Sequence, residues 1–375
     1  MTVPETLIQD TLTTPALLLD EARMMRNIAR LATHAERLGV TLRPHLKTAK
    51  SVEVARRVTG GMPGPITVST LAEAEVFHDA GHRDILYAVG IAPQKLARVR
   101  ALRGRGCDLV VILDSAAQAR AVAQAQVPAL IEIDCDGHRG GLRPDDPALI
   151  EIGRLLHEAG CLKGVMTHAG ESYTVRGDAA HAAFAEQERA AVVAAADRLR
   201  HTGLPCPTVS VGSTPTAHAA RDLTGVTELR AGVYMFFDLV MAGIEVCTPD
   251  DIALSVLTTV IGHQTAKGWT MIDAGWMALS RDRGTAAQEV DQGYGLVCDE
   301  DGNVLPDLIV SSANQEHGIV TRRSGAEGPM PDLPVGTRLR ILPNHACATA
   351  AQHDRYTVLP RDGGPVQTWP RFGGW

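Results

Sequence analysis

The chain has 375 residues with 36 basic and 43 acidic side chains, a net charge of −7, and is 45% hydrophobic. This composition buries a full core and excludes a disordered protein, and the acidic balance argues against nucleic acid or an anionic membrane as a partner. No apolar run approaches the roughly 20 residues of a membrane-spanning helix. Residues 1–15 are too polar for a signal peptide, and the seven scattered cysteines favour reduced thiols, so we predict a cytoplasmic globular protein.

Short β-branched runs alternate with Ala-, Arg- and Glu-rich runs of helical period up to about residue 235. Eight strands with a helix between each and the next predict a (β/α)8 barrel. A doubly wound open sheet has the same rhythm and is the alternative, which the count of eight disfavours. The predicted strands are 40–47, 66–70, 84–89, 108–114, 128–134, 163–169, 207–213 and 227–235. The predicted helices are 21–37, 49–58, 71–80, 93–103, 116–125, 146–159, 181–202 and 216–222.

The pattern changes after residue 250, where helical runs become scarce and Gly, Pro and Asp separate the apolar runs. We therefore predict a barrel over 15–250 and a largely β domain over 251–375, with 1–14 attached to the β domain. The segment 14–20 either joins that sheet or leads into the barrel. The predicted strands of the β domain are 254–263, 269–275 and 339–350, with a hairpin at 299–307.

Lys47 lies in the segment RPHLKTAK at the carboxyl end of the first predicted barrel strand. Active sites of such barrels lie at that end of the sheet. A lysine at the barrel floor can lose its proton by burial and act as a nucleophile, typically by forming a Schiff base. The alternative is that Lys47 and Lys50 are solvated residues of a strand-to-helix loop, and position alone favours this alternative.

His345 and Cys347 are two residues apart in the predicted strand 339–350. Residues i and i+2 of a strand point to one face, so the imidazole and the thiolate could share a metal. This donor pair suits zinc, and two protein ligands leave positions for water or substrate, as in a catalytic site. Taken alone the pattern is weak, because Cys is often a small core residue and His a satisfied one. Other histidines lie in Gly-rich segments at 138, 168 and 317.

The segment 211–216 lies after the seventh predicted strand, and the segment 230–234 lies at the eighth. Phosphate sites in (β/α)8 barrels are frequently built there, and the hydroxyls of Ser213 and Thr214 would be suitable donors. No dinucleotide-binding glycine pattern follows any strand. An ordinary Gly/Ser/Thr turn is the alternative. Strands one and eight become neighbours when the barrel closes, so Lys47 would lie beside these two segments. This proximity favours a phosphate site over an ordinary turn.

Together these motifs resemble the pyridoxal-phosphate enzymes of alanine-racemase-like fold that act on D-3-hydroxy amino acids. The resemblance covers about residues 14–375 and is greatest to the metal-dependent D-serine and D-threo-3-hydroxyaspartate dehydratases. Aldolases of the same group usually carry His-x-Asp where this chain has His345-x-Cys347, which favours a dehydratase. The segment MIDAGWMALSRDRG is nearer the hydroxyaspartate enzymes. The motifs are RPHLKTxK, VSTLAEAE, DGHRGG, GSTPT, NQEHG and PNHACATA.

The resemblance implies that Lys47 carries pyridoxal 5′-phosphate covalently. It also implies that Arg139 or Arg230 approaches the cofactor ring, where an arginine at the pyridine nitrogen keeps that nitrogen unprotonated by charge repulsion. Both arginines could instead be structural. The residues implied to contact the cofactor are Arg139, His168, Tyr173, Ser213, Thr214, Arg230, Gly232 and Val233.

The resemblance further implies that His345 and Cys347 bind a divalent metal: zinc, or cobalt, manganese or magnesium. This metal helps the β-hydroxyl to leave, so that the products are a 2-oxo acid and ammonia. The implied substrate contacts are Gln315, His317 and Arg283. A guanidinium fork at Arg281 or Arg283 would suit a substrate β-carboxylate, although a solvated charge cluster around Asp282 is an equal alternative.

Two other functions remain open. An aldolase would give glycine and an aldehyde from the same parts. A non-catalytic pyridoxal-phosphate carrier also has a single barrel with a lysine, but residues 251–375 with their His-x-Cys motif count against it. The resemblance also implies a homodimer.

Overall fold

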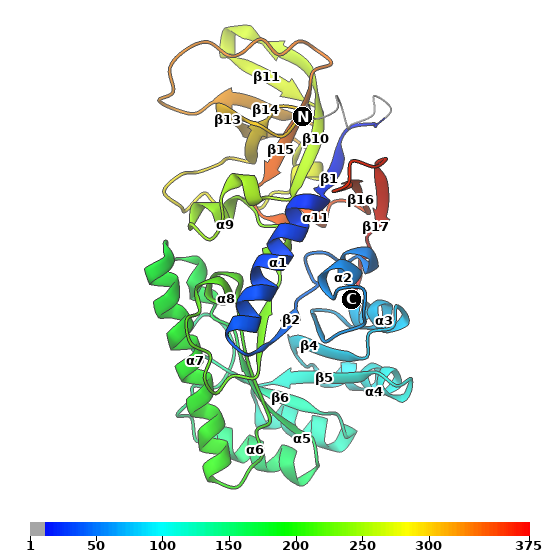
Figure 1. Ribbon diagram of the computed structural model, residues 1–375, viewed down its shortest axis with the longest axis vertical. Coiled ribbons are helices and arrows are strands. Elements are labelled where there is room, and N and C mark those ends of the chain that lie inside the picture. Colours follow the sequence, from blue (N-terminus) through cyan, green and yellow to red (C-terminus); the bar gives the residue numbers. More distant parts are fainter. Residues whose placement is uncertain (1–11) are drawn as a thin grey trace. The chain divides into compact units, whose positions relative to one another are not determined.

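The computed structural model describes residues 12–375 and divides them into two compact units (Figure 1). One unit contains residues 29–234 and 372–375, and the other contains 12–28 and 235–371. Residues 1–11, which include most of the polar opening, lie outside the described residues. Within the described part, no helix has the length and apolar character needed to cross a membrane.

The first unit is a nearly closed barrel of parallel strands, as predicted, so the doubly wound alternative is wrong. The seam between its first and last strands in the sheet order is bridged at His45 and Thr67, where the Leu46 N–H donates to the Thr67 carbonyl over 2.9 Å. The sheet order is β2-β9-β8-β7-β6-β5-β4-β3. The strands are β2 (Thr41–Pro44), β3 (Ile66–Val68), β4 (Asp84–Gly90), β5 (Asp108–Leu113), β6 (Ala129–Ile133), β7 (Leu162–Thr167), β8 (Thr208–Val211) and β9 (Glu228–Ala231).

Helices alternate with these strands, and α3 to α7 lie around the outside of the sheet (Figure 1). Side-chain caps begin several of them: the Thr70 hydroxyl accepts the Glu73 N–H over 3.0 Å, and the Ser115 hydroxyl accepts the Gln118 N–H. The eight predicted helices are confirmed to within a few residues. They are α1 (Glu21–Arg37), α2 (Val52–Val58), α3 (Leu71–Asp79), α4 (Leu96–Gly104), α5 (Ala116–Ala125), α6 (Ala148–Glu158), α7 (Asp178–His201) and α8 (Thr214–Ala219).

The second unit is built on a mostly antiparallel sheet of order β11-β14-β13-β12-β15-β10-β1-β16-β17. β1 pairs with β10 and β16, so the segment 14–20 joins this sheet. This pairing puts residues before 29 in the β unit, and the chain returns to it at 235 rather than after 250. The strands are β1 (Ala16–Asp20), β10 (Leu254–Gln264), β11 (Trp269–Ile272), β12 (Gly295–Cys298), β13 (Val304–Ala313), β14 (Gly318–Arg322), β15 (Arg338–Pro343), β16 (Arg355–Leu359) and β17 (Gln367–Pro370).

The predicted strand 339–350 is wrong beyond Pro343, where β15 ends and the short helix α11 (Ala346–Ala350) follows. Two buried side chains turn the chain away from the sheet. Asp238 accepts the Ala346 N–H over 2.9 Å, and the Asn344 amide accepts the Thr285 N–H over 2.8 Å. Two other short helices lie in this unit, α9 (Leu239–Gly243) and α10 (Trp276–Leu279). The seven cysteines, all within the described residues, are free thiols.

Candidate active site

The predicted cofactor residues lie at the carboxyl edge of the parallel sheet, in loops that follow neighbouring strands. Because β2, β9, β8 and β7 are consecutive in the sheet, the loops after them share one end of the barrel. The loop after β6 adjoins them. The structure thus brings most of the predicted cofactor set to one edge. Its members are Lys47 after β2, Arg139 after β6, His168 after β7, Ser213 and Thr214 after β8, and Gly232 and Val233 after β9.

Lys47 is exposed, so the burial expected at the barrel floor is not what the structure has. Its N–H donates to Nδ1 of His45 over 3.4 Å, and Nε2 of His45 lies 3.3 Å from the Ser69 hydroxyl. Burial, with added repulsion from Lys47 and Arg230, holds the pKa of His45 well below its usual range. His45 is therefore a neutral imidazole that accepts at Nδ1 and donates from Nε2. No role was predicted for His45, although it lies two residues before Lys47.

The turn after β8 is shaped by Gly212, whose φ is +143°. A Cβ there would lie 1.8 Å from the Arg230 carbonyl oxygen, so the backbone after β8 approaches strand β9 at a distance that only glycine permits. The Ser213 hydroxyl is occupied, because it lies 2.9 Å from both the Ser172 and the Thr216 hydroxyls. Ser213 thus caps α8 and is less available to a phosphate than predicted.

Two buried hydroxyls in these loops are available to a ligand. Thr214 Oγ1 and the Tyr234 hydroxyl lack a hydrogen-bond partner among the described residues. Leaving such a group unpaired costs about 1–3 kcal/mol, so a phosphate that accepts from it is stabilised. The Gly232 backbone is also close to the Lys47 loop, since a Cβ on it would lie 3.2 Å from the His45 carbonyl oxygen. These features fit the phosphate of pyridoxal phosphate.

Of the two candidate arginines, Arg230 is buried and Arg139 is half exposed. Arg230 donates to the Ser210 hydroxyl and the Thr167 carbonyl, which fixes its guanidinium inside the barrel. Burial lowers the pKa of Arg230, against the opposing effect of Glu228 and other carboxylates. Arg139 has a longer contact, 3.8 Å from Glu132. Arg230 is thus the more rigidly held of the two.

His168 donates from Nδ1 to the Gly212 carbonyl over 2.8 Å. Burial, with repulsion from Arg139, lowers the pKa of His168 to about 3, so the ring is neutral and Nε2 carries a lone pair. The Tyr173 ring is tilted against it at 6.4 Å between centroids, which places these two predicted residues together.

The predicted metal ligands lie in the β unit at the start of α11. His345 is the N-cap and Cys347 is in the first turn, so helical geometry and not a strand face brings them together. Oδ2 of Asp282 binds Nδ1 of His345 at 2.6 Å. Burial lowers the pKa of His345, but Cys347, Asp238 and Asp282 outweigh it and raise the pKa to about 10. Among residues 12–375 no group of three or more His, Cys, Asp or Glu side chains is arranged for a metal.

The donor set at α11 nevertheless fits an open metal site. Imidazole and thiolate are preferred zinc ligands, and a carboxylate on the far ring nitrogen is the usual support for a ligating histidine. Asp282 is held in place because the Ser280 hydroxyl accepts its N–H over 3.1 Å. The Thr349 hydroxyl donates to the Leu279 carbonyl over 2.9 Å and fastens α10 to α11. From the sequence, Asp282 was predicted only as part of a charge cluster.

The two arginines that flank Asp282 have partners of their own. Arg283 pairs with Asp291 and lies 5.5 Å from the centre of the Tyr294 ring. Arg281 stacks on Trp276 at 4.1 Å. The three charged side chains are exposed, and each has a different partner.

Gln315 and His317, the other predicted substrate contacts, are exposed in the turn between β13 and β14. The Gln315 carbonyl accepts the Met277 N–H over 3.1 Å, which fixes this turn to α10. The candidate metal and substrate residues of the β unit are thus connected through α10.

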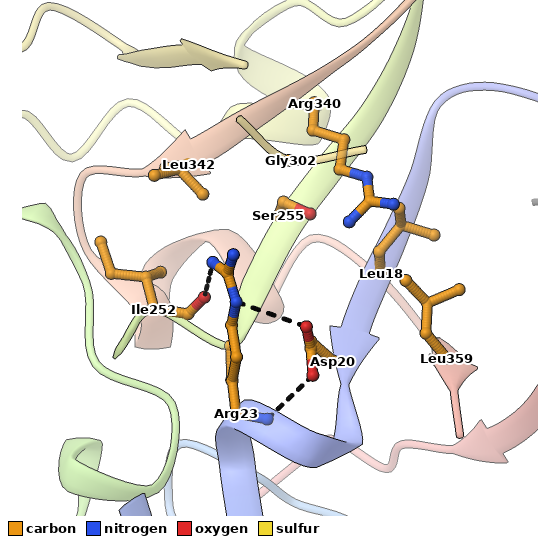
Figure 2. A pocket seen from close by; sticks show the side chains of 10 residues that line it. Leu18, Asp20, Arg23, Ile252, Ser255, Gly302, Arg340, Leu342 and Leu359 are labelled. Carbon is orange, nitrogen blue, oxygen red and sulfur yellow. Dashed lines mark hydrogen bonds and ion pairs between the residues drawn. The ribbon is translucent and has the colours of Figure 1, made fainter. Parts of the chain in front are cut away.

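A small pocket in the β unit lies away from these residues, at the start of α1 (Figure 2). Asp20 caps the helix by accepting the Arg23 N–H over 2.8 Å, and it also pairs with the Arg23 side chain. Arg23 donates to the Ile252 carbonyl over 3.1 Å, which ties the helix start to the sheet (Figure 2). The pocket lining includes none of the predicted site residues, and its contacts explain how α1 begins.

Comparison with known proteins adds to this geometry. The profile described as "Alanine racemase, N-terminal domain" matches residues 19–240, and "Putative serine dehydratase domain" matches 253–359. A D-threo-3-hydroxyaspartate dehydratase of Delftia sp. is 58% identical, with 97% of this chain and 98% of that protein covered. The chain belongs to the D-threo-3-hydroxyaspartate dehydratase family. The resemblance predicted from the sequence motifs is confirmed.

Solved structures of the Delftia protein match with a TM-score of 0.95 and 56% identity, covering 99% of this chain and 100% of that chain. One of them is a cysteine-to-alanine variant in a metal-free form. A D-threonine aldolase of Arthrobacter sp. is more distant, at 32% identity over 95% of this chain and 91% of that protein. The family membership therefore favours a dehydratase over an aldolase.

Proposed function

We propose that this protein is a pyridoxal-phosphate- and metal-dependent dehydratase that converts D-threo-3-hydroxyaspartate to oxaloacetate and ammonia. D-serine, which would give pyruvate and ammonia, is the next substrate in order of preference. The observation that carries the proposal is the 58% identity to a D-threo-3-hydroxyaspartate dehydratase over nearly the whole chain. The His345–Cys347 pair with Asp282 behind it supports the metal requirement.

When bound, pyridoxal phosphate supplies an electron sink for a Cα carbanion, and a divalent metal supplies a Lewis acid for departure of the β-hydroxyl. Lys47 would hold the cofactor covalently and, once released by the substrate amine, would take the Cα proton. Thr214 and Tyr234 would donate to the phosphate, since their buried hydroxyls lack a partner among the described residues. Neutral His168 and the fixed guanidinium of Arg230 would orient the ring.

We assign the metal and the recognition of the β-carboxylate to residues of the β unit. His345 and Cys347 would hold the metal, with Asp282 keeping Nδ1 of His345 occupied so that Nε2 is the ligating atom. Arg283 would select the β-carboxylate of hydroxyaspartate. Gln315 and His317 would contact the substrate from the turn between β13 and β14, which is hydrogen-bonded to α10. The expected homodimer and cytoplasmic location stay predictions.

The aldolase alternative uses the same residues but breaks the Cα–Cβ bond. Product identification separates the two reactions. We would supply purified protein with pyridoxal phosphate and zinc, then offer D-threo-3-hydroxyaspartate, D-serine and D-threonine separately. The proposal predicts oxaloacetate and ammonia fastest from the first substrate. Glycine and an aldehyde as main products would contradict it, and cofactor binding without turnover of any of the three would favour a carrier protein.

A further inference from the structure

Glu188 is a buried carboxylate in the middle of α7 with no role in the proposed chemistry. It is 2% exposed, although its neighbours Glu186 and Gln187 on the helix are exposed. Burial raises the pKa of Glu188, and the hydrogen bonds that it accepts oppose this rise. A carboxyl group in such a position must be held by several hydrogen-bond donors.

Three segments of the barrel unit donate to this carboxylate. Oε1 accepts the Ala169 N–H over 3.1 Å and the Gly212 N–H over 2.9 Å. Oε2 accepts the Thr216 hydroxyl over 2.7 Å. Glu188 therefore connects the loop after β7, the turn after β8 and the helix α8, which are the segments that carry His168, Ser213 and Thr214.

A closed network extends from these contacts. Thr216 Oγ1 accepts the Ser213 N–H over 3.1 Å, and the Ser213 and Ser172 hydroxyls lie 2.9 Å apart. The Ser172 hydroxyl returns to the Ala169 carbonyl over 2.7 Å. The Gly212 and Ala169 N–H groups and the Ser213 hydroxyl all form hydrogen bonds within this network. The buried Thr214 Oγ1 has no hydrogen-bond partner among the described residues.

We propose that Glu188 is a positioning residue for the cofactor: by fixing Ala169, Gly212 and Thr216, it sets the positions of Thr214 and His168. Gly212 connects Glu188 to His168 directly. Its N–H donates to Glu188, and its carbonyl accepts a hydrogen bond from Nδ1 of His168. The carboxylate acts through these groups and does not itself touch the phosphate. The inference rests on the proposed binding of pyridoxal phosphate.

The test compares Glu188→Met, which keeps the side-chain length but accepts no hydrogen bond, with Glu188→Gln. A glutamine oxygen can still accept both N–H groups while its NH2 donates to Thr216 Oγ1. We expect the dissociation constant for pyridoxal phosphate to rise about tenfold or more in Glu188→Met and to stay within about threefold of wild type in Glu188→Gln. Glu186→Gln, on the same helix but exposed and paired with Arg189, is the matched control and should bind as wild type.

Fluorescence or absorbance titration gives the dissociation constant, and bound metal is measured alongside, because its ligands lie in the other unit. A purely structural role would lower the melting temperature without changing cofactor affinity in the folded fraction. If Glu188→Met does not fold, Thr216→Val removes the hydroxyl that contacts both Glu188 and Ser213, with little change in shape, and should weaken binding about threefold or more. Wild-type affinity in the folded variants, or equal weakening by Gln and Met, would overturn the inference. Failure of the wild-type protein to bind pyridoxal phosphate would instead contradict the proposed function.

Discussion

In the barrel unit the candidate residues follow the carboxyl ends of consecutive parallel strands, whereas in the β unit they lie on short helices and turns held by hydrogen bonds to side chains distant in the sequence. Parallel topology alone brings Lys47, Thr214 and His168 to one edge. No such rule applies to His345 and Cys347, whose position depends on Asp238 and Asn344. The barrel unit thus relies on its sheet to place functional groups, and the β unit relies on individual polar side chains.

The candidate-site histidines of the two units also differ in their pKa values. Burial among cations lowers the pKa of His45 and His168, so both rings are neutral. Cys347 and two carboxylates raise the pKa of His345 to about 10. Neutral rings suit hydrogen bonding at a cofactor. A cationic ring beside a thiolate suits a site where a metal ion replaces the proton.

The largest effect should come from Lys47→Ala, which tests whether the barrel unit alone holds the cofactor. We expect loss of the covalent cofactor and a fall in turnover of roughly a thousandfold or more, with bound metal unchanged. Intact mass after borohydride reduction and a 2-oxo acid assay measure the two effects. Lys163→Ala, an exposed lysine on β7, is the control. A Lys47→Ala protein that retains a reducible cofactor adduct would refute the assignment.

A smaller, unit-specific effect is expected from Asp282→Asn. The substitution keeps the size but weakens the contact that fixes Nδ1 of His345, so zinc affinity should fall roughly tenfold to a hundredfold. Cofactor affinity should not change. Competition against a zinc indicator measures the first quantity, with exposed Asp250→Asn as control. Equal zinc affinity in both variants would show that Asp282 does not support the ligand.

Arg283→Ala examines substrate choice. The loss of a guanidinium that binds the β-carboxylate should lower kcat/KM for D-threo-3-hydroxyaspartate about tenfold and leave D-serine unaffected. Arg281→Ala, whose guanidinium stacks on Trp276, is the comparison and should have the lesser effect. If neither variant changes the ratio of the kcat/KM values for the two substrates, these arginines do not bind the β-carboxylate.

The smallest effect concerns acid stability of the barrel unit. Burial lowers the pKa of His218 to about 3, while an unfolded histidine titrates near 6.5. The unfolded state therefore binds a proton first, and stability present above about pH 6.5 is lost as the pH falls toward 3. Between pH 7.5 and 5.5, the melting temperature of His218→Gln should fall about 2 °C less than that of wild type. An identical fall in both proteins would contradict this role of His218.

Much of the barrel could be predicted because each strand and helix has its own hydrophobic period. The strand-end positions of Lys47, His168 and Thr214 follow from that topology. Glu188 was missed because a glutamate in a charged, Ala-rich helix resembles a surface residue. A signal was nevertheless present, since Glu188 shares a face of α7 with the buried Ala185 and Val192.

The β unit was less predictable for a physical reason. Its turn at 344–347 depends on Asp238, more than 100 residues earlier in the sequence, whose carboxylate accepts the Ala346 N–H. The sequence pattern predicted a strand over 339–350, whereas β15 ends at Pro343. The contact that turns the chain there comes from a distant residue and leaves no local signal. Asp282 was hidden between two arginines, and only the fold shows that its partner is His345.

The most direct test of the account removes the metal and leaves the cofactor in place. The loaded protein would be treated with a chelator, then examined by cofactor absorbance and by product analysis with D-threo-3-hydroxyaspartate. We predict that the absorbance of bound cofactor persists while the formation of oxaloacetate and ammonia stops. Added zinc should restore product formation in wild type but not in Cys347→Ala. Undiminished oxaloacetate formation from the metal-free protein would contradict the account.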